Sequence, residues 1–443
     1  MRPEPAPGNA GEERHGASGA ITPHPAIHVT PDPTRLVIRP FAPAEPDPST
    51  GRADRLADRV MALSDAALRD ELYHVIAHLA ERHRDIEQVL MRRFEAINGL
   101  IIANRPASAE QAQLIGAYFS EEYAFEAGAV LNPSIVAHPD QSALAPGATR
   151  FILSLRSMGE GDVSSITFRT GTWSAAGNVR IHPASPMAVS PRIEQIAGGM
   201  QGGEAIRLHC DAVTDLSEIV IFPITPTQRH GIEDLRLVPF VEEDGRMTYL
   251  GTCVAFSGSA IRQELLRTED FVTFDLAPVS GEATRDKGLV LFPRRIGGRY
   301  AALSRKDHEN IWFVQSDDLQ DWSGGTVAVT PQWPWEFVQL GNCGAPIEIA
   351  EGWLLVTHGV GPVRNYCLGA CLLDRDDPGK VLARTVTPLL RPSGAERDGY
   401  VPNVIYSCGA LLRDRELLLP YGVADSFTAF ATVNLDQLLD EMR

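Results

Sequence analysis

The stretch GIEDLRLVPF, residues 231–240, places two carboxylates and an arginine directly before an apolar run. Residues 237–240 and MTYLGTCVAF read as strands, with EEDG as the hairpin turn between them. Glu233, Asp234 and Arg236 therefore fall near the mouth of a strand. Asp234 is our candidate general acid, because a general acid needs a pKa that its surroundings adjust. The neighbouring Glu233 raises the proton affinity of Asp234, and Arg236 lowers it. The alternative is a simple ion pair of Glu233 with Arg236, with Asp234 capping a turn.

A second group of residues is cationic or phenolic and recurs at similar points of successive strand pairs. It consists of Lys287, Arg305, His358 and Tyr366. These side chains could converge on one anion, because arginine offers a bidentate pair of donors and lysine a point charge. Phosphate is the anion that we expect as the ligand. Taken singly, each of these residues is more often a surface charge or a satisfied core residue.

A third group carries amides, hydroxyls and carboxylates in turn-rich segments. Its members are Asn132, Ser134, Arg156, Glu396, Asn403 and Asp425. Such groups suit a sugar, whose hydroxyls both donate and accept hydrogen bonds. Metal ligation is the weaker reading, because no histidines and carboxylates fall at short fixed spacing.

The elements that must position these residues are short strands. From about residue 110 the apolar pattern alternates, and turn signals near 243, 297, 351 and 410 recur at intervals of about 50 residues. About four strands per interval is typical of propeller blades, and residues 110–443 have room for five or six. A β-sandwich is the rival architecture.

The N-terminal part differs in composition. Residues 1–50 are rich in proline, glycine and glutamate, which predicts a largely disordered or extended arm. We predict a helical extension over residues 51–109. Apolar residues at three- and four-residue steps predict one helix over 64–97 with Ser64 as its N-cap. This helix either packs on the main domain or serves as a dimerisation arm.

The overall composition excludes several classes of partner. A formal net charge of −17 without a basic run argues against nucleic acid, and no apolar stretch reaches the length of a membrane helix. The start of the chain lacks the apolar region of a signal peptide, so we expect a cytoplasmic protein. Six cysteines without a CxxC pair indicate reduced, mostly buried thiols.

Five segments, in order, resemble glycoside hydrolase family 130. They are GIEDLRLVPF, KGLVLFPRRIGGRYAALSRKDHENIWFVQSDDLQDW, GNCGAPIEIAEGWLLVTHGVG, LLDRDDP and ERDGYVPNVIYSCGALL followed by YGVADS. NPSIVAHPDQS and RFILSLRSMGEGDVSSITFRTG are most similar to the branch that acts on β-1,2-linked mannose, which also carries a helical N-terminal extension.

The resemblance implies an all-β, five-bladed β-propeller over residues 110–443. It also implies an inverting, reversible β-mannoside phosphorylase that makes α-mannose 1-phosphate, with inorganic phosphate as co-substrate and no metal or other cofactor. Asp234 matches the family's general acid, thought to act through a hydroxyl of the bound mannose. The family's phosphate positions match Lys287, Arg305, His358 and Tyr366. Its contacts with the non-reducing mannose match Asn132, Arg156 and Asp425.

The chain departs from the family pattern at a few positions near the sugar. Gln339 stands where lysine is common, Cys253 and Val254 replace tyrosine and threonine, and Asp162 replaces a histidine. We predict the substrate-binding set Asn132, Ser134, Arg156, Glu233, Arg236, Gln339, Glu396, Asn403 and Asp425.

Phosphate arrives already anionic, so one acid suffices, whereas an inverting hydrolase needs a second carboxylate. An inverting β-mannosidase and a non-catalytic mannoside-binding propeller are the alternatives to the phosphorylase. The partners we expect are a β-mannoside and phosphate, with a homodimer through the helix as a further hypothesis.

Overall fold

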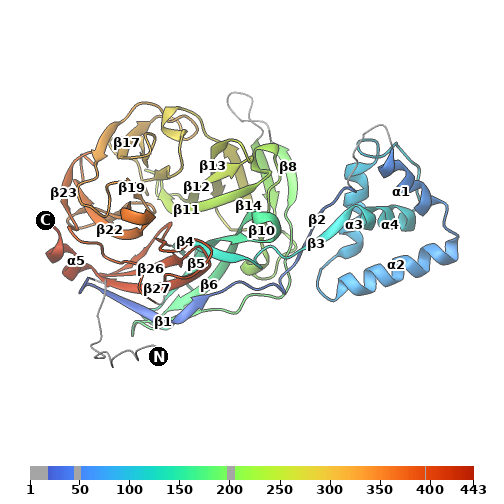
Figure 1. Cartoon of the computed structure of the whole chain (residues 1–443), viewed down its shortest axis with the longest axis horizontal. Helices are drawn as coiled ribbons and strands as arrows, with labels where there is room; N and C mark the ends of the chain where they lie inside the picture. The colour runs from blue at the N-terminus through green and yellow to red at the C-terminus, as the bar shows by residue number, and fades with distance from the viewer. Residues whose placement is uncertain (1–17, 44–50, 197–204, 395) are drawn as a thin grey trace, which may run out of the picture.

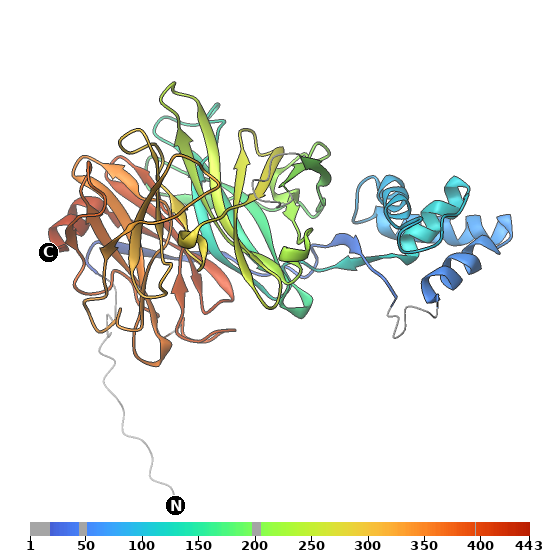
Figure 2. The same cartoon turned by 90° about the horizontal axis from the view of Figure 1, so that it is seen from above.

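A computed structural model describes residues 18–43, 51–196, 205–394 and 396–443. It shows a mostly β body with a helical unit on one side, joined by a two-stranded ribbon (Figures 1 and 2). The ribbon is β2 (Val37–Pro40) paired with β3 (Ser120–Tyr123). None of the helices in the described ranges is both long and apolar enough to cross a membrane.

Four helices make up the helical unit. They are α1 (Arg52–Met61), α2 (Asp65–Ala80), α3 (Ile86–Ile97) and α4 (Ala109–Tyr118). Ser64 caps α2 as predicted, since its Oγ accepts from the Ala67 amide at 3.3 Å. The single helix expected over 64–97 is wrong. The chain turns at Asp85, where φ is 50°, and α3 folds back against α4 so closely that a Cβ on Gly116 would lie 2.0 Å from the Leu90 carbonyl oxygen.

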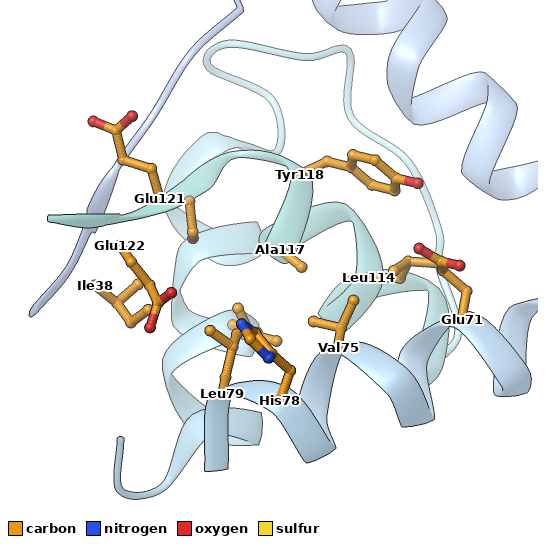
Figure 3. A pocket seen from close by; sticks show the side chains of 12 residues that line it. Ile38, Glu71, Val75, His78, Leu79, Leu114, Ala117, Tyr118, Glu121 and Glu122 are labelled. Atoms are coloured by element: carbon orange, nitrogen blue, oxygen red, sulfur yellow. The ribbon is translucent and has the colours of Figure 1, made fainter. Parts of the chain in front are cut away.

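The helical unit has a core of its own and one pocket of about 300 Å³. Figure 3 shows Val75, Leu79, Leu114 and Ala117 on its walls, with Glu71 and Glu122 among the polar residues around them. The pocket lies between α2, α4 and the ribbon and shares no residue with the predicted site.

The largest sheet of the body has eleven strands. Its first part is β4 (Ala129–Ala137), β5 (Thr149–Met158) and β6 (Ser164–Trp173), with β7 (Val179–Ile181) and β10 (Val220–Ile221) beside β6. Its second part is β11 (Gly231–Val241), β12 (Met247–Phe256), β13 (Ile261–Thr268), β14 (Thr273–Pro278), β9 (Ala205–His209) and β8 (Arg192–Ile196). A parallel bridge between Ser164 and Gly231 joins the two parts.

Three further sheets follow along the chain. The next contains β15 (Val290–Leu291), β16 (Tyr300–Ser304), β17 (Ile311–Ser316) and β18 (Thr326–Val329). Then come β19 (Gln339–Asn342), β20 (Ile347–Ile349), β21 (Gly352–Val360), β22 (Tyr366–Leu373) and β23 (Val381–Arg384). The last contains β24 (Ile405–Tyr406), β25 (Leu411–Arg413), β26 (Glu416–Val423), β27 (Phe427–Asn434) and β1 (Ile21–Val29), and helix α5 (Leu435–Glu441) follows.

Apolar clusters fill the spaces between successive sheets. Leu340 and Trp353 pack with Val290 and Leu303, for example, and the last sheet packs on the first strands through Phe430 and Phe151. Figure 1 accordingly shows the sheets arranged around a common centre. Within the described residues no single sheet closes on itself, so the five-bladed propeller stays a prediction.

The N-terminal segment differs from the prediction of a disordered or extended arm over residues 1–50. Residues 1–17 and 44–50 lie outside the described residues. The described part forms two strands, because Ile21 to Val29 pairs antiparallel with β27 and Val37 to Pro40 pairs with β3. Strand β1 therefore completes the last sheet, whereas β2 belongs to the ribbon. The helical unit also extends past the predicted boundary at residue 109, to Tyr118.

Candidate active site

Asp234 lies in a bulge of β11. The pairing with β12 shifts between Glu233 and Arg236, and Asp234 has a φ of 55°. Neighbouring side chains on a regular strand point to opposite faces, but a bulge re-aims them. Arg156 consequently reaches both carboxylates, Glu233 Oε1 at 2.9 Å and Asp234 Oδ1 at 3.7 Å.

A second bulge faces the first. Register along β4 shifts between Leu131 and Ser134, and Asn132 has a φ of 49°. Its Nδ2 donates to Asp234 Oδ1 at 2.7 Å, while its Oδ1 is buried without a hydrogen-bond partner. The side-chain amide of Asn132 therefore orients one oxygen of Asp234, and its own oxygen Oδ1 is left able to accept a hydrogen bond.

Arg236 contacts both the backbone carbonyl oxygen and the carboxylate of Asp234. It is almost fully buried, and its guanidinium donates to the Asp234 carbonyl oxygen at 3.0 Å, to the Cys343 carbonyl oxygen at 3.1 Å and to Tyr406 Oη at 2.9 Å. These contacts join β11 to the sheets of β19 and β24. Because these donors are used inside the protein, Arg236 positions Asp234, and its place in the substrate-binding set stays a prediction.

Ser134 is also engaged within the protein, and its place in the substrate-binding set stays a prediction. Its side chain is fully buried, and its Oγ accepts from the Leu237 amide at 3.1 Å, which ties β4 to β11. Glu396 is also engaged within the protein, since its carboxylate accepts from Tyr421 Oη at 3.1 Å and from the Ser393 amide at 3.2 Å.

The charges around Asp234 decide its protonation. Burial alone raises the pKa of this carboxyl, but Arg156, Arg236, Lys287 and the Asn132 hydrogen bond outweigh it and hold the pKa below its ordinary value. Asp234 is thus ionised at neutral pH in the ligand-free protein. A bound anion that offsets the neighbouring positive charge would raise its pKa again.

The four predicted anion-binding residues come together. Arg305 Nη1 donates to His358 Nε2 at 3.2 Å, and the His358 ring is stacked with that of Tyr366 at a centroid distance of 6.1 Å. Lys287 forms an ion pair with Glu233, which places it beside Asp234. Two sheets and their loops contribute these four residues, so the formation of the group depends on how the two sheets pack.

His358 is neutral in this arrangement. Burial lowers its pKa well below the ordinary value, and the charges of Arg305 and Arg236 lower it further. Its Nε2 accepts from Arg305 and also from Gln339 Nε2 at 3.2 Å, because an arginine can only donate. In the ligand-free protein His358 therefore orients Arg305, and Gln339 belongs to the same group.

Asp425 and Asn403 both have left-handed backbones, with φ of 50° and 61°. Burial raises the pKa of Asp425, while the charge of Arg156 lowers it, so Arg156 faces all three acidic residues Glu233, Asp234 and Asp425. The Asn403 carbonyl oxygen accepts from the Tyr366 amide at 3.0 Å and thus holds the segment that carries Tyr366.

Three residues that the sequence did not single out complete the site. Asp286 accepts from Arg305 Nε at 3.0 Å, and Asn342 donates from Nδ2 to the Gly288 carbonyl oxygen at 2.8 Å. Tyr406 binds Arg236, as above. Asp286 directly precedes Lys287, and that adjacency was the one available signal, whereas Asn342 and Tyr406 act through contacts distant in the chain.

A family model described as beta-1,4-mannooligosaccharide phosphorylase, of glycoside hydrolase family 130, matches residues 210–443, which include most of the site. The chain belongs to glycoside hydrolase family 130. The resemblance inferred from the motifs is thereby confirmed.

Two curated family 130 relatives are similar to this chain. A 1,2-beta-oligomannan phosphorylase of Thermoanaerobacter sp. is 34% identical over 48% of this chain and 72% of its own length. A beta-1,2-mannobiose phosphorylase of Listeria innocua is 31% identical over 50% of this chain and 63% of its own length. The alignments thus span about two thirds of these relatives.

The fold has solved counterparts. The structure of a glycosyl hydrolase from Bacteroides ovatus aligns with a TM-score of 0.51 at 15% identity, over 70% of this chain and 86% of that one. At this identity the likeness concerns the fold alone.

Proposed function

We propose that this family 130 protein is an inverting β-mannoside phosphorylase that acts on β-1,2-linked mannobiose or short oligomannan. Phosphate attacks the anomeric carbon, the glycosidic C–O bond breaks, and a proton from Asp234 goes to the leaving oxygen, through a hydroxyl of the bound mannose. The products are α-mannose 1-phosphate and an acceptor shortened by one mannose, and the reaction runs in both directions.

One observation supports this proposal: Arg305, His358 and Tyr366 contact one another, and Lys287 lies beside Asp234 through its ion pair with Glu233. A phosphate held there brings its own negative charge to the site, so no second carboxylate has to activate a water molecule. The cations bind it against the protein's negative charge and place an oxygen for in-line attack.

The same phosphate makes Asp234 a usable acid. In the free site Arg156, Arg236 and Lys287 hold the pKa of Asp234 low despite its burial. Phosphate offsets part of that positive charge, so Asp234 takes up a proton as the second substrate binds. Asn132, Arg156 and Asp425 are proposed to hold the non-reducing mannose.

The linkage is part of the proposal. Three curated relatives are named for β-1,2 linkages, whereas another relative and the family model are described by β-1,4-mannooligosaccharides. The deciding experiment incubates the purified protein with β-1,2-mannobiose, with and without phosphate, and follows mannose 1-phosphate by phosphorus NMR, with β-1,4-mannobiose in parallel.

A phosphate-dependent α-anomeric signal with β-1,2-mannobiose supports the proposal. Free mannose formed without phosphate would show that the protein is a hydrolase. Turnover of β-1,4-mannobiose but not of β-1,2-mannobiose would change the proposed linkage specificity from β-1,2 to β-1,4.

We also propose that the body is a five-bladed propeller. The eleven-stranded sheet would divide into two blades at the Ser164–Gly231 bridge, and the three later sheets would supply the other blades. The apolar clusters between successive sheets support this division.

We propose a homodimer through the helical unit, which exposes the apolar side chains of Tyr73, Leu100, Ile101 and Tyr118. Light scattering of the wild type and of Leu100→Asp tests it, because a dimer should dissociate in the variant. We retain the cytoplasm as the proposed location, since all six cysteines are free and buried.

A further inference from the structure

The turn between β21 and β22 has an unusual backbone. Val363 and Arg364, two consecutive residues in it, have φ of 51° and 56°. The left-handed region is unfavourable for residues with a side chain, and most of all for a β-branched valine. The Val363 side chain is 88% exposed, so its own packing does not compensate for the conformation.

The consequence of this turn is the position of Arg364. Its guanidinium carbon lies 5.9 Å from the centre of the Tyr366 ring, and its charge reaches Asp425, opposing the effect of burial on the pKa of that carboxyl. Arg364 therefore lies between Tyr366, one of the predicted phosphate-binding residues, and Asp425, one of the predicted mannose-binding residues. Strained backbone at such a place is a pointer to function.

Arg364 also differs from the other cations of the site. Lys287 is neutralised by Glu233, and Arg305 by Asp286. Among the described residues, Arg364 has no carboxylate within ion-pair distance, so its guanidinium keeps its donors for a ligand.

The surroundings of the turn fit an anion as well. A cavity of about 1010 Å³ is lined by Pro362 and Asn365 of this turn and also by Arg391 and Arg397. Both arginines bring positive charge beside the turn in a protein whose net charge is −17, although Glu396 and Asp398 flank Arg397 in the chain.

We propose that Arg364 is a further phosphate-binding residue, which contacts the phosphate group from the rim of the site above Tyr366. It binds inorganic phosphate in phosphorolysis and the phosphate of the sugar 1-phosphate in synthesis. This inference rests on the proposed function. It explains why the turn keeps two left-handed residues: a relaxed turn would carry the guanidinium elsewhere.

The test compares Arg364→Ala and Arg364→Lys with the wild type. Loss of a charge-assisted contact should raise the KM for phosphate about tenfold or more in Arg364→Ala and less in Arg364→Lys, with the KM for mannobiose within about twofold. Arg246→Ala is the matched control, because Arg246 is exposed in the β11–β12 turn, away from Asp234 along β11. It should leave both KM values unchanged.

A second readout does not depend on turnover. Phosphate alone should raise the Tm of the wild type, and the same phosphate concentration should raise that of Arg364→Ala less. An unchanged phosphate KM together with an unchanged Tm shift would overturn the inference, and so would a rise in the KM for mannobiose alone. If the wild type makes no mannose 1-phosphate, the proposed function fails, and the Tm shift still tests Arg364.

Discussion

At the residue scale, Asp234 is held between competing influences. Its carboxylate is buried, hydrogen-bonded by Asn132 and surrounded by Arg156 and Arg236. An amide in its place keeps the shape and the contact with Arg156 but has no proton to give. We expect Asp234→Asn to lower turnover by about 10²-fold or more. Activity within a few-fold of the wild type, with far-UV circular dichroism unchanged, would exclude Asp234 as the acid.

Arg305 allows a different prediction, because it faces the anion. Arg305→Ala removes a guanidinium that His358 and Asp286 orient. We expect it to raise the KM for phosphate at least about tenfold and to change the KM for mannobiose little. Initial rates at varied phosphate, with saturating mannobiose, measure this. A phosphate KM like that of the wild type would contradict the anion site.

Asp425 links the site to stability. Burial raises its pKa, although Arg156 opposes the shift. The folded-state pKa thus lies above the unfolded one, so the associated stability is full below the unfolded pKa of about 3.9 and is lost as the pH rises through the folded pKa. Ionised Asp425 therefore destabilises the ligand-free protein at neutral pH.

Asp425→Asn should accordingly raise the Tm at pH 7, with a difference from the wild type that shrinks towards pH 4, and should weaken mannoside binding. Thermal unfolding at several pH values measures the first effect. A Tm difference independent of pH would show that Asp425 does not titrate as inferred.

At the element scale, bulges and turns aim the side chains of the site. Residues Asn132, Asp234, Val363, Arg364 and Asp425 all have left-handed backbones although none is a glycine. Proteins tolerate this conformation where the surroundings compensate for it, and active sites are common among such places. These left-handed residues therefore lie at bulges and turns, where regular strand pairing is interrupted.

The turn at Val363 offers a direct measure of this strain. Glycine adopts a φ of 51° without the steric penalty, so Val363→Gly should stabilise the protein by about 1 kcal/mol. Val327→Gly is the control, because Val327 is a partly exposed residue of strand β18 and its loss should destabilise. Urea unfolding of the two variants should show opposite signs, and a loss of stability in both would remove the argument from strain.

At the scale of the whole molecule, charged side chains connect the helical unit to the rest of the protein. Arg84, between α2 and α3, forms two hydrogen bonds with the buried Glu218 of the body, at 2.7 and 2.8 Å. Arg82 and His83 bind Glu122 at the start of the ribbon. These ion pairs form a polar joint between the helical unit and the body.

Arg84→Ala should therefore cost about 2 kcal/mol, because it leaves a buried carboxylate with weaker partners. Hydrogen exchange should increase in α2 and α3 more than in β11 and β19. Glu218→Gln combined with Arg84→Ala should recover part of the loss. Uniform exchange across the chain would mean that the joint does not connect the two units.

The sequence by itself determined the family, the strand-rich body and the Ser64 cap, and it predicted the residues of the candidate site. Alternating apolar residues, turn signals and short motifs are local properties, and they can be read without knowing which strands are neighbours. Asp234, Lys287, Arg305, His358 and Tyr366 were all found through such motifs.

Only the tertiary structure decided how these residues divide the work. Whether a polar atom faces a ligand or the protein depends on partners far along the chain, so Ser134 and Arg236 emerged as supports of β11. The break at Asp85 and the pairing of Ile21–Val29 with β27 likewise follow from long-range packing. Local pattern cannot encode such contacts, because they form between segments that only the folded chain brings together.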